Sequence, residues 1–161
     1  MTATITELRE IASRVTDPEI PVLTIADLGI LRDVEMAGDT VVVTITPTYS
    51  GCPAMDAITE DLGIVFKESG YQDVRVNLVL SPAWSTDWMT ESGKSKLQAY
   101  GIAPPTGTGH RGPVTLGLAV KCPQCHSLNT KELSRFGSTA CKSMYQCKDC
   151  LEPFDYFKVL S

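Results

Sequence analysis

Two cysteine pairs in the C-terminal third constrain the fold of this chain more than any other feature. Cys122 and Cys125 form one CxxC pair, Cys147 and Cys150 form the other, and 21 residues separate them. This spacing is close to that of a zinc ribbon, in which two knuckles each present two thiolates to one tetrahedral ion. We therefore predict a four-cysteine site that binds structural zinc.

Other interpretations of the same four cysteines stay open. Thiolates also accept iron or an iron–sulfur cluster, so the sequence does not choose between zinc and iron. Four buried cysteines that bind no metal are a further alternative. Cys141 is a fifth thiol in this region, and either it replaces one ligand or it is a small buried residue. We expect His126 and His110 to be surface residues.

The segment around these cysteines is short. Residues 114–161 cannot bury much apolar surface, so metal binding must supply part of the free energy of folding. Apolar stretches predict short strands at residues 115–120, 144–146 and 154–159. The C-terminal third is therefore predicted to be a small β zinc ribbon.

The first hundred residues carry a different pattern. Apolar side chains recur at helical spacing after a capping-box sequence at Thr4, and again after Pro53. This order of elements predicts an α+β fold, a small three-stranded sheet with helices on one face. The expected strands are residues 30–36, 41–46 and 74–80, and the last helix is expected at about residues 87–100.

Between the two patterns lies the segment APPTGTGHRGP, residues 103–113. It is rich in proline and glycine and has no apolar periodicity, which is typical of a linker. We predict an α+β domain at residues 1–102, a linker at residues 103–113 and a zinc-ribbon domain at residues 114–161.

Charge and composition argue against several classes of partner and cellular location. The net charge is −5, from 19 acidic and 14 basic residues, and no basic cluster stands out. Nucleic acid is therefore a disfavoured partner. No apolar run is long enough to cross a bilayer, and the N-terminus lacks the apolar region of a signal peptide. We expect a cytoplasmic protein, whose cysteines are then ligands or nucleophiles rather than disulfides.

Cys52 is the one cysteine outside the ribbon. It directly precedes a predicted helix, whose N-terminal N–H groups favour a thiolate. It is either a reactive thiol that handles metal or sulfide, or a capping residue without chemistry. Asp17 and Glu19 flank Pro18 in a rigid turn; they could act as an acid–base pair, but turn and cap roles are commoner.

Two tryptophans lie four residues apart, Trp84 and Trp88, on either side of Asp87. They are expected to anchor the core, with a partner-binding patch as the alternative. The sequence shows no Ser/His/Asp arrangement, no phosphate-binding glycine loop and no His-carboxylate iron triad. We therefore do not expect an independent catalyst.

Three stretches together resemble a known family. Residues 17–21 (DPEIP) continuing to Asp27, the segment TPTYSGCP with Cys52, and the segment SPAWSTDWMT resemble the PaaD proteins of phenylacetate degradation. These belong to a wider family of SufT-like iron–sulfur assembly proteins. The ribbon, with FGSTACKSMYQCKDCLEPFDYFK, is similar to the C-terminal extension of the PaaD branch.

The resemblance implies a fold like the C-terminal domain of iron–sulfur scaffold proteins. It also implies an accessory, non-catalytic role in maturing the iron–sulfur or di-iron centre of the multicomponent phenylacetyl-CoA ring 1,2-epoxidase, a monooxygenase. Cys52 corresponds to the family's loop cysteine, and Asp17 and Glu19 to its DPE segment; Trp84 and Asp87 lie in the third matching stretch.

Several points stay open at this stage. The implied partners are the reductase or the di-iron oxygenase and the iron–sulfur assembly machinery, and the sequence does not identify the client. It leaves undecided whether the chain carries a transient iron–sulfur cluster and whether it forms a homodimer. The alternative function is a stable structural subunit of the oxygenase complex.

Overall fold

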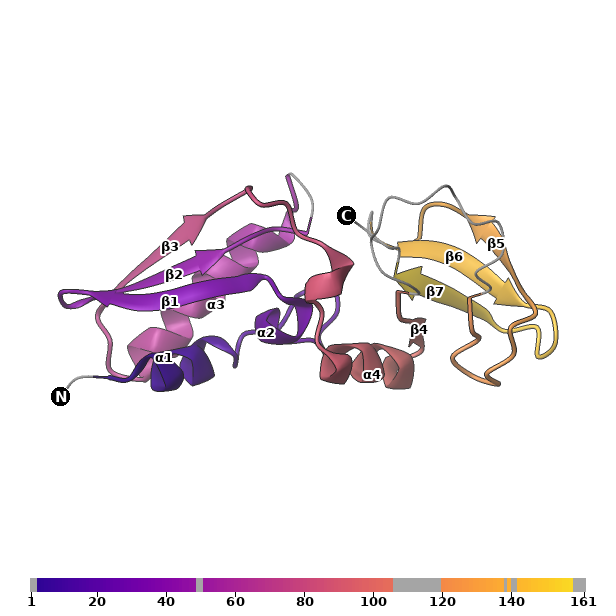
Figure 1. The fold of residues 1–161 in the computed structure, drawn as a ribbon, viewed down its shortest axis with the longest axis horizontal. Coiled ribbons are helices and arrows are strands. Elements are labelled where there is room, and N and C mark those ends of the chain that lie inside the picture. Colours follow the sequence, from indigo (N-terminus) through magenta and orange to yellow (C-terminus); the bar gives the residue numbers. More distant parts are fainter. Residues whose placement is uncertain (1–2, 49–50, 106–119, 138, 140–141, 158–161) are drawn as a thin grey trace. The chain divides into compact units, whose positions relative to one another are not determined.

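The computed structural model describes residues 3–48, 51–105, 120–137, 139 and 142–157. The chain divides into two compact units (Figure 1). The first unit comprises Met1–Trp84 with Trp88–Thr90, and the second comprises Ser85–Asp87 with Glu91–Ser161.

The first unit is the predicted α+β fold. Its sheet has the strand order β1-β2-β3, with β1 antiparallel and β3 parallel to the central strand β2. Helices α1 and α3 lie on one face of this sheet (Figure 1). The elements are α1 (Ile5–Ala12), α2 (Ile25–Leu28), β1 (Leu31–Ala37), β2 (Thr40–Ile45), α3 (Ala54–Glu68) and β3 (Asp73–Leu78).

The core of the first unit follows from the sequence pattern. The capping box forms as predicted, because the backbone N–H of Glu7 donates to Thr4 Oγ1 at 3.2 Å and the N–H of Thr4 donates to Glu7 Oε2 at 2.8 Å. Helix α3 presents one buried stripe to the sheet. The fully buried side chains of this stripe are Ile58, Leu62 and Phe66, and those of β2 are Val41, Val43 and Ile45.

Helix α2 was not expected from the sequence. Its four residues begin at a second capping box, formed by Thr24 and Asp27, and end at Gly29 in the left-handed conformation, with φ +78°. The indole Nε1 of Trp84 donates to the backbone oxygen of Leu28 at 2.8 Å. A Cβ atom at position 29 would lie 2.5 Å from the backbone oxygen of Trp88. This turn therefore fixes both tryptophans against the first unit.

The second unit is built around a four-stranded sheet with the order β4-β7-β6-β5. Strand β4 is parallel to β7, whereas β7, β6 and β5 are successively antiparallel. A short 3-10 turn, η1 (Thr86–Trp88), lies where the chain divides. The other elements are α4 (Glu91–Tyr100), β4 (Ile102–Ala103), β5 (Thr130–Ser134), β6 (Lys142–Cys147) and β7 (Pro153–Phe157).

The chain divides earlier than the predicted boundary at residue 102. Helix α4 belongs to the second unit, because it leads directly into β4, which pairs with β7, and because Gln98 lies 3.3 Å from the His126 ring. The predicted linker thus starts within β4. Most of this linker, and most of the predicted strand at residues 115–120, lies outside the described residues.

Two of the predicted ribbon strands are present, at β6 and β7, and β5 is additional. Strand β5 escaped prediction because its residues, TKELS, are almost all exposed and carry no apolar alternation.

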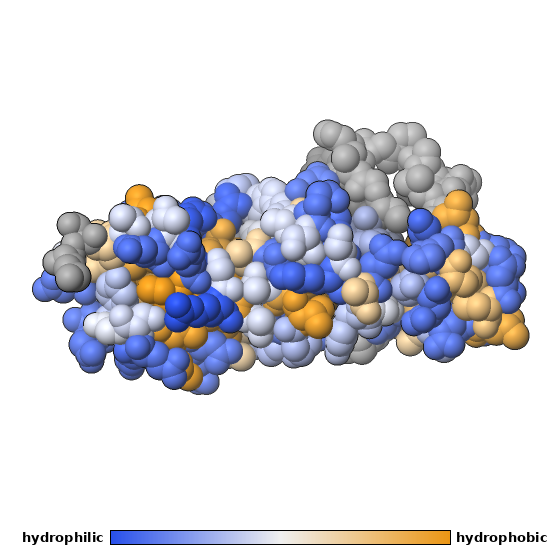
Figure 2. All heavy atoms as spheres, turned by 90° about the horizontal axis from the view of Figure 1, so that it is seen from below, coloured by the Kyte–Doolittle hydropathy of each residue, from blue (hydrophilic) through white to orange (hydrophobic). Residues whose placement is uncertain are grey.

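Surface properties differ between the units. The first unit carries thirteen acidic and five basic side chains, and the second carries six acidic and nine basic ones. On the face shown in Figure 2, hydrophobic residues form several separate patches among hydrophilic ones. Among the described residues, no helix is both long and apolar enough to cross a membrane.

The Gly29 turn yields the first testable prediction. Gly29→Ala should destabilise the first unit by about 3 kcal/mol, because strain at positive φ adds to a clash with the Trp88 backbone. Gly38 is the matched control, since it has φ +66° and nothing within 4 Å of an added Cβ. Gly38→Ala should cost only about 1 kcal/mol. Urea unfolding followed by tryptophan fluorescence measures both, and equal losses would contradict the close packing of Trp88.

Candidate metal centre and thiol pocket

The four ribbon cysteines converge on one point in the second unit. All four Sγ atoms lie within 4.8 Å of one another. The Sγ atoms of Cys122 and Cys150 are 3.7 Å apart, and those of Cys125 and Cys147 are 3.5 Å apart. In a tetrahedral zinc site with Zn–S bonds of about 2.3 Å, neighbouring sulfurs lie about 3.8 Å apart. The arrangement therefore fits a tetrahedral metal site with four cysteine ligands.

The two knuckles have the same backbone geometry. The N–H of the first cysteine in each pair donates to the backbone oxygen five residues later, from Cys122 to Ser127 at 2.9 Å and from Cys147 to Glu152 at 3.0 Å. The residue after each second cysteine adopts positive φ, 63° at His126 and 66° at Leu151. Each knuckle thus turns its two thiols toward the same side.

Asp149 ties one knuckle to the other. It lies between Cys147 and Cys150, and its carboxylate accepts hydrogen bonds from the hydroxyl of Ser127 and from Asn129 Nδ2, the latter at 3.0 Å. Hydrogen bonds from Ser127 and then Asn129 hold the pKa of Asp149 below its usual value. This cross-link lies beside the sulfurs and fixes the separation of the two pairs.

Hydrogen bonds and burial shift the pKa values of Cys147 and Cys150 in opposite directions. A hydrogen bond from the Cys150 backbone lowers the pKa of Cys147 to about 7. At Cys150 the Glu152 backbone N–H lowers the pKa, but burial and the neighbouring thiols together raise it to about 12. The four sulfurs cannot all ionise at this distance without a cation among them. A bound divalent cation would supply the positive charge that stabilises the four thiolates, and it would displace the protons that remain on the sulfurs.

The metal ligands are also part of the ribbon core. Cys122 and Cys147 are fully buried and pack in one cluster with Val120, Phe154 and Tyr156. Tyr145 packs against this cluster, with its ring 5.3 Å from that of Tyr156. The candidate metal ligands and the apolar cluster thus belong to one buried set of side chains.

Cys52 lies in the first unit, two residues before α3, and only 8 % of it is exposed. Its backbone oxygen accepts a hydrogen bond from the N–H of Met55 at 3.3 Å, so the chain already turns into the helix at this point. The thiol borders a surface pocket of 340 Å³. The residues that line the pocket are Pro47, Gly51, Cys52, Pro53, Met55, Asp56, Leu78 and Leu80.

This lining includes residues that the sequence did not indicate. Asp56 brings a carboxylate to the pocket, and its position four residues after Cys52 is the one signal that could have revealed it. Leu78 and Leu80 come from the end of β3 and remain 53 % and 58 % exposed.

Asp17 and Glu19 form a turn and do not line this pocket. Asp17 is buried, and its Oδ1 accepts hydrogen bonds from the N–H groups of Glu19 at 2.7 Å and Ile20 at 3.1 Å. The backbone N–H of Asp17 donates to Leu23 at 2.9 Å. These contacts favour the turn role over an acid–base pair.

The two tryptophans have different environments. Trp84 is buried, so it is a core residue and not part of an exposed patch. Trp88 is half-buried, and the Arg32 guanidinium lies 3.9 Å from its ring centroid, a cation–π contact. Asp87 is exposed, and its backbone N–H donates to Ser85 Oγ at 3.2 Å.

Comparison with known proteins identifies the family. A profile described as "PaaD zinc beta ribbon domain" matches residues 109–158, and one described as "Iron-sulfur cluster assembly protein" matches residues 6–83. An Escherichia coli protein, provisionally named as a component of 1,2-phenylacetyl-CoA epoxidase, is 47 % identical over 96 % of this chain and 92 % of its own length. The chain belongs to the PaaD family.

Other similarities cover the first unit of this PaaD protein. An "Fe-S protein maturation auxiliary factor" of Porphyromonas gingivalis is 40 % identical over 52 % of this chain and 80 % of its own length. The crystal structure of a domain of unknown function from Bacillus anthracis superposes with a TM-score of 0.54 at 30 % identity. It covers 58 % of this chain and 90 % of that one. The predicted resemblance to SufT-like proteins is confirmed.

The metal centre yields a second prediction. Cys147→Ala should abolish binding of one metal equivalent per chain and unfold the ribbon, because it removes both a ligand and a fully buried core residue. Elemental analysis after gel filtration measures the metal. Both tryptophans lie in the first unit, so their fluorescence should report that this unit stays folded. Cys141→Ala is the control and should keep the metal. Retention of a full equivalent by Cys147→Ala would instead indicate Cys141 as a ligand.

A third prediction concerns the left-handed residue of the second knuckle. Leu151 is 67 % exposed at positive φ, so its side chain gains little from burial while the backbone is strained. Leu151→Gly should stabilise the second unit by about 1 kcal/mol. Lys131→Gly, at an exposed position that pairs regularly with Gln146 within β5, should destabilise it by a similar amount. Hydrogen exchange of the β6 and β7 amides measures both, and a loss of stability in Leu151→Gly would contradict the strain.

Proposed function

We propose that this PaaD protein is an accessory maturation factor for a metal centre of the multicomponent phenylacetyl-CoA ring 1,2-epoxidase. In this proposal the Cys52 pocket handles iron or sulfide during maturation. The observation that carries it is the thiol itself, which borders a 340 Å³ pocket in the unit that matches the iron–sulfur assembly profile. Relatives that cover this unit are named Fe–S protein maturation auxiliary factors.

The donor set of the pocket favours a transient role. This chain offers one thiol, from Cys52, and one carboxylate, from Asp56. Iron–sulfur clusters are ordinarily held by four thiolates, so a cluster at this position needs further ligands from another protein. A shared and incomplete site can release its cargo to a client, whereas a complete site would retain it.

The ribbon, unlike the Cys52 pocket, offers a complete set of four ligands for a tetrahedral ion. Four thiolates from one unit close the coordination sphere of a tetrahedral ion and leave no open position for a substrate. We therefore propose that the ribbon holds a resident structural zinc ion through Cys122, Cys125, Cys147 and Cys150. Iron transfer then belongs to the first unit alone.

The proposed clients follow from the family. They are the iron–sulfur reductase and the di-iron oxygenase of the epoxidase, with the iron–sulfur assembly machinery as the source of cargo. We place the protein in the cytoplasm, because Cys52 and the ribbon ligands must stay reduced to bind metal. The Asp17–Glu19 turn and the Trp84 anchor support the fold of the first unit in this scheme.

A second function is favoured by one observation. The Escherichia coli relative that matches nearly the whole chain is named as part of the epoxidase, and a stable structural subunit would also account for that name. The two functions differ once the client is metallated. A maturation factor can then be removed without loss of epoxidase activity, whereas removal of a structural subunit abolishes it.

A fourth prediction tests the role of Cys52. Cys52→Ser should keep the fold and the zinc content but leave co-expressed epoxidase short of iron or cluster and at least tenfold less active. Met55→Leu is the control, since it changes the same pocket without removing a ligand, and it should retain activity. Iron and acid-labile sulfide in the purified client provide the readout. Full client metallation with Cys52→Ser would show that the Cys52 thiol takes no part in metal or sulfide transfer.

A further inference from the structure

The outer edge of β3 is open. The backbone N–H of Val79 donates to Ile45 in β2 at 2.9 Å. In a strand the backbone groups of successive residues point to opposite edges, so Arg75 and Asn77 also face β2. The N–H and C=O groups of Val74, Val76 and Leu78 then face outward. They have no hydrogen-bond partner among the described residues of the chain.

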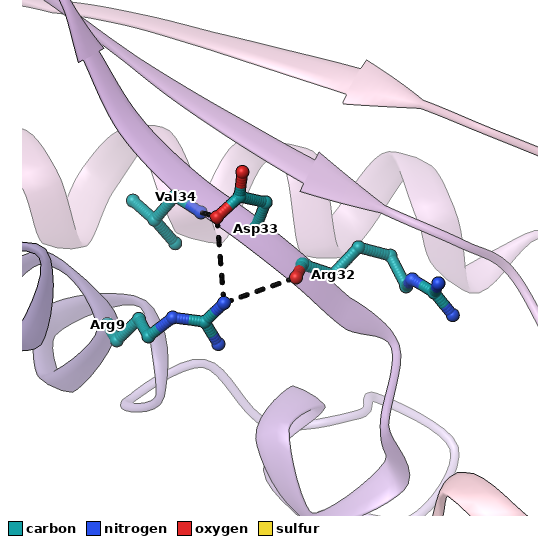
Figure 3. Close-up of polar contacts among 4 residues, drawn as sticks. All are labelled: Arg9, Arg32, Asp33 and Val34. Carbon is teal, nitrogen blue, oxygen red and sulfur yellow. Dashed lines mark hydrogen bonds and ion pairs between the residues drawn. The ribbon is translucent and has the colours of Figure 1, made fainter.

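The first half of the opposite edge of the same sheet is covered. In β1, Arg9 Nη2 donates to the backbone oxygen of Arg32 at 3.2 Å and lies 3.6 Å from Asp33 Oδ1 (Figure 3). The same Asp33 oxygen accepts the backbone N–H of Val34 at 2.9 Å. A register shift between Leu31 and Asp33 further distorts this strand. Folded proteins commonly protect exposed strand edges in these ways.

The open edge leads to the cysteine pocket. Strand β3, with the sequence DVRVNL, contains no proline, no lysine and no register shift against β2. Its C-terminal end presents Leu78 and, just beyond the strand, Leu80, both more than half exposed and both lining the pocket beside Cys52. A polypeptide that extended this sheet would therefore pass directly beside the thiol.

We propose that the outer edge of β3 binds an extended, basic segment of the client as a fourth strand of the sheet. This inference rests on the proposed function, since the client is the protein that receives metal or sulfide at Cys52. The outward groups of Val74, Val76 and Leu78 pair with the client backbone, and apolar client side chains pack on Leu78 and Leu80. Pairing of this kind positions the client's own ligands next to Cys52.

The negative charge of the first unit favours a basic segment as the partner of the β3 edge. The first unit has thirteen acidic and five basic side chains, so it attracts a segment rich in lysine or arginine. Pairing of β3 with β3 of a second copy would bring two such acidic units together and is disfavoured. An open backbone edge accepts only extended segments, which excludes a docked helix.

Hydrogen exchange measured by NMR tests the proposal at the level of single amides. The probes are the apo-reductase and the metal-free oxygenase of the epoxidase, each added to the full-length protein. With one of them, exchange at Val74, Val76 and Leu78 should slow at least tenfold, whereas Arg75 and Asn77 should change little. Binding without this alternation, binding of neither probe, or protection in the absence of both through self-association would overturn the proposal.

Proline variants separate backbone pairing from side-chain contact. Val76→Pro removes one outward N–H and no bond to β2, so it should weaken client binding at least tenfold. Val76→Ala keeps the N–H and should bind within about threefold of the natural protein. Val74→Pro and Val74→Ala repeat the comparison at the other end of the strand in case Val76→Pro does not fold, which tryptophan fluorescence would reveal. Equal binding by the proline and alanine variants would overturn the proposal.

A failure of the docking proposal and a failure of the proposed function give different experimental results. If Cys52→Ser supports full metallation while the proline variants lose binding, the edge is a docking strand and Cys52 is not the transfer thiol. If Cys52→Ser blocks metallation while the proline variants still bind, the transfer role stands and the client docks elsewhere.

Discussion

Four sulfur atoms within 4.8 Å of one another impose the strongest constraint on the second unit. As thiolates they repel one another, and as thiols two of them, Cys122 and Cys147, lie buried in a small core. One divalent cation would resolve both difficulties, because it would neutralise the charge of the thiolates and join the two knuckles. The first cysteines of these knuckles, Cys122 and Cys147, lie 25 residues apart in the sequence.

The first unit does not depend on a metal ion for its stability. Its helices and sheet bury a continuous set of leucine, isoleucine and valine side chains, so ordinary hydrophobic burial stabilises it. Its single cysteine, Cys52, is therefore not required to stabilise the fold through a metal ion. Cys52 lies where α3 begins, and Leu78 and Leu80 lie where β3 ends, so one pocket collects groups from both elements. Among the described residues, the structure thus separates a cluster of four thiols that fits a metal ion from a pocket that Cys52 borders.

Local patterns in the sequence predicted the parts of this fold that depend on local physics. The CxxC spacing indicated the ribbon, and the Thr4 capping box indicated the start of α1, because each signal involves residues a few positions apart. Features set by long-range contacts were missed. Helix α4 has a helical pattern, but only its link to β4 and the pairing of β4 with β7 assign it to the second unit. Likewise, no local pattern brings Leu78 and Leu80 to Cys52, because they meet it only after β3 pairs with β2.

The central claim is that the ribbon holds a structural zinc ion and that the iron–sulfur chemistry belongs to Cys52. Metal and acid-labile sulfide analysis of the full-length protein, purified anaerobically, tests this most directly when combined with X-ray absorption at the metal edge. The account predicts one zinc per chain, coordinated by four sulfurs at about 2.3 Å, and no stoichiometric labile sulfide bound by the ribbon. Iron and sulfide in stoichiometric amounts on Cys122, Cys125, Cys147 and Cys150 would contradict it.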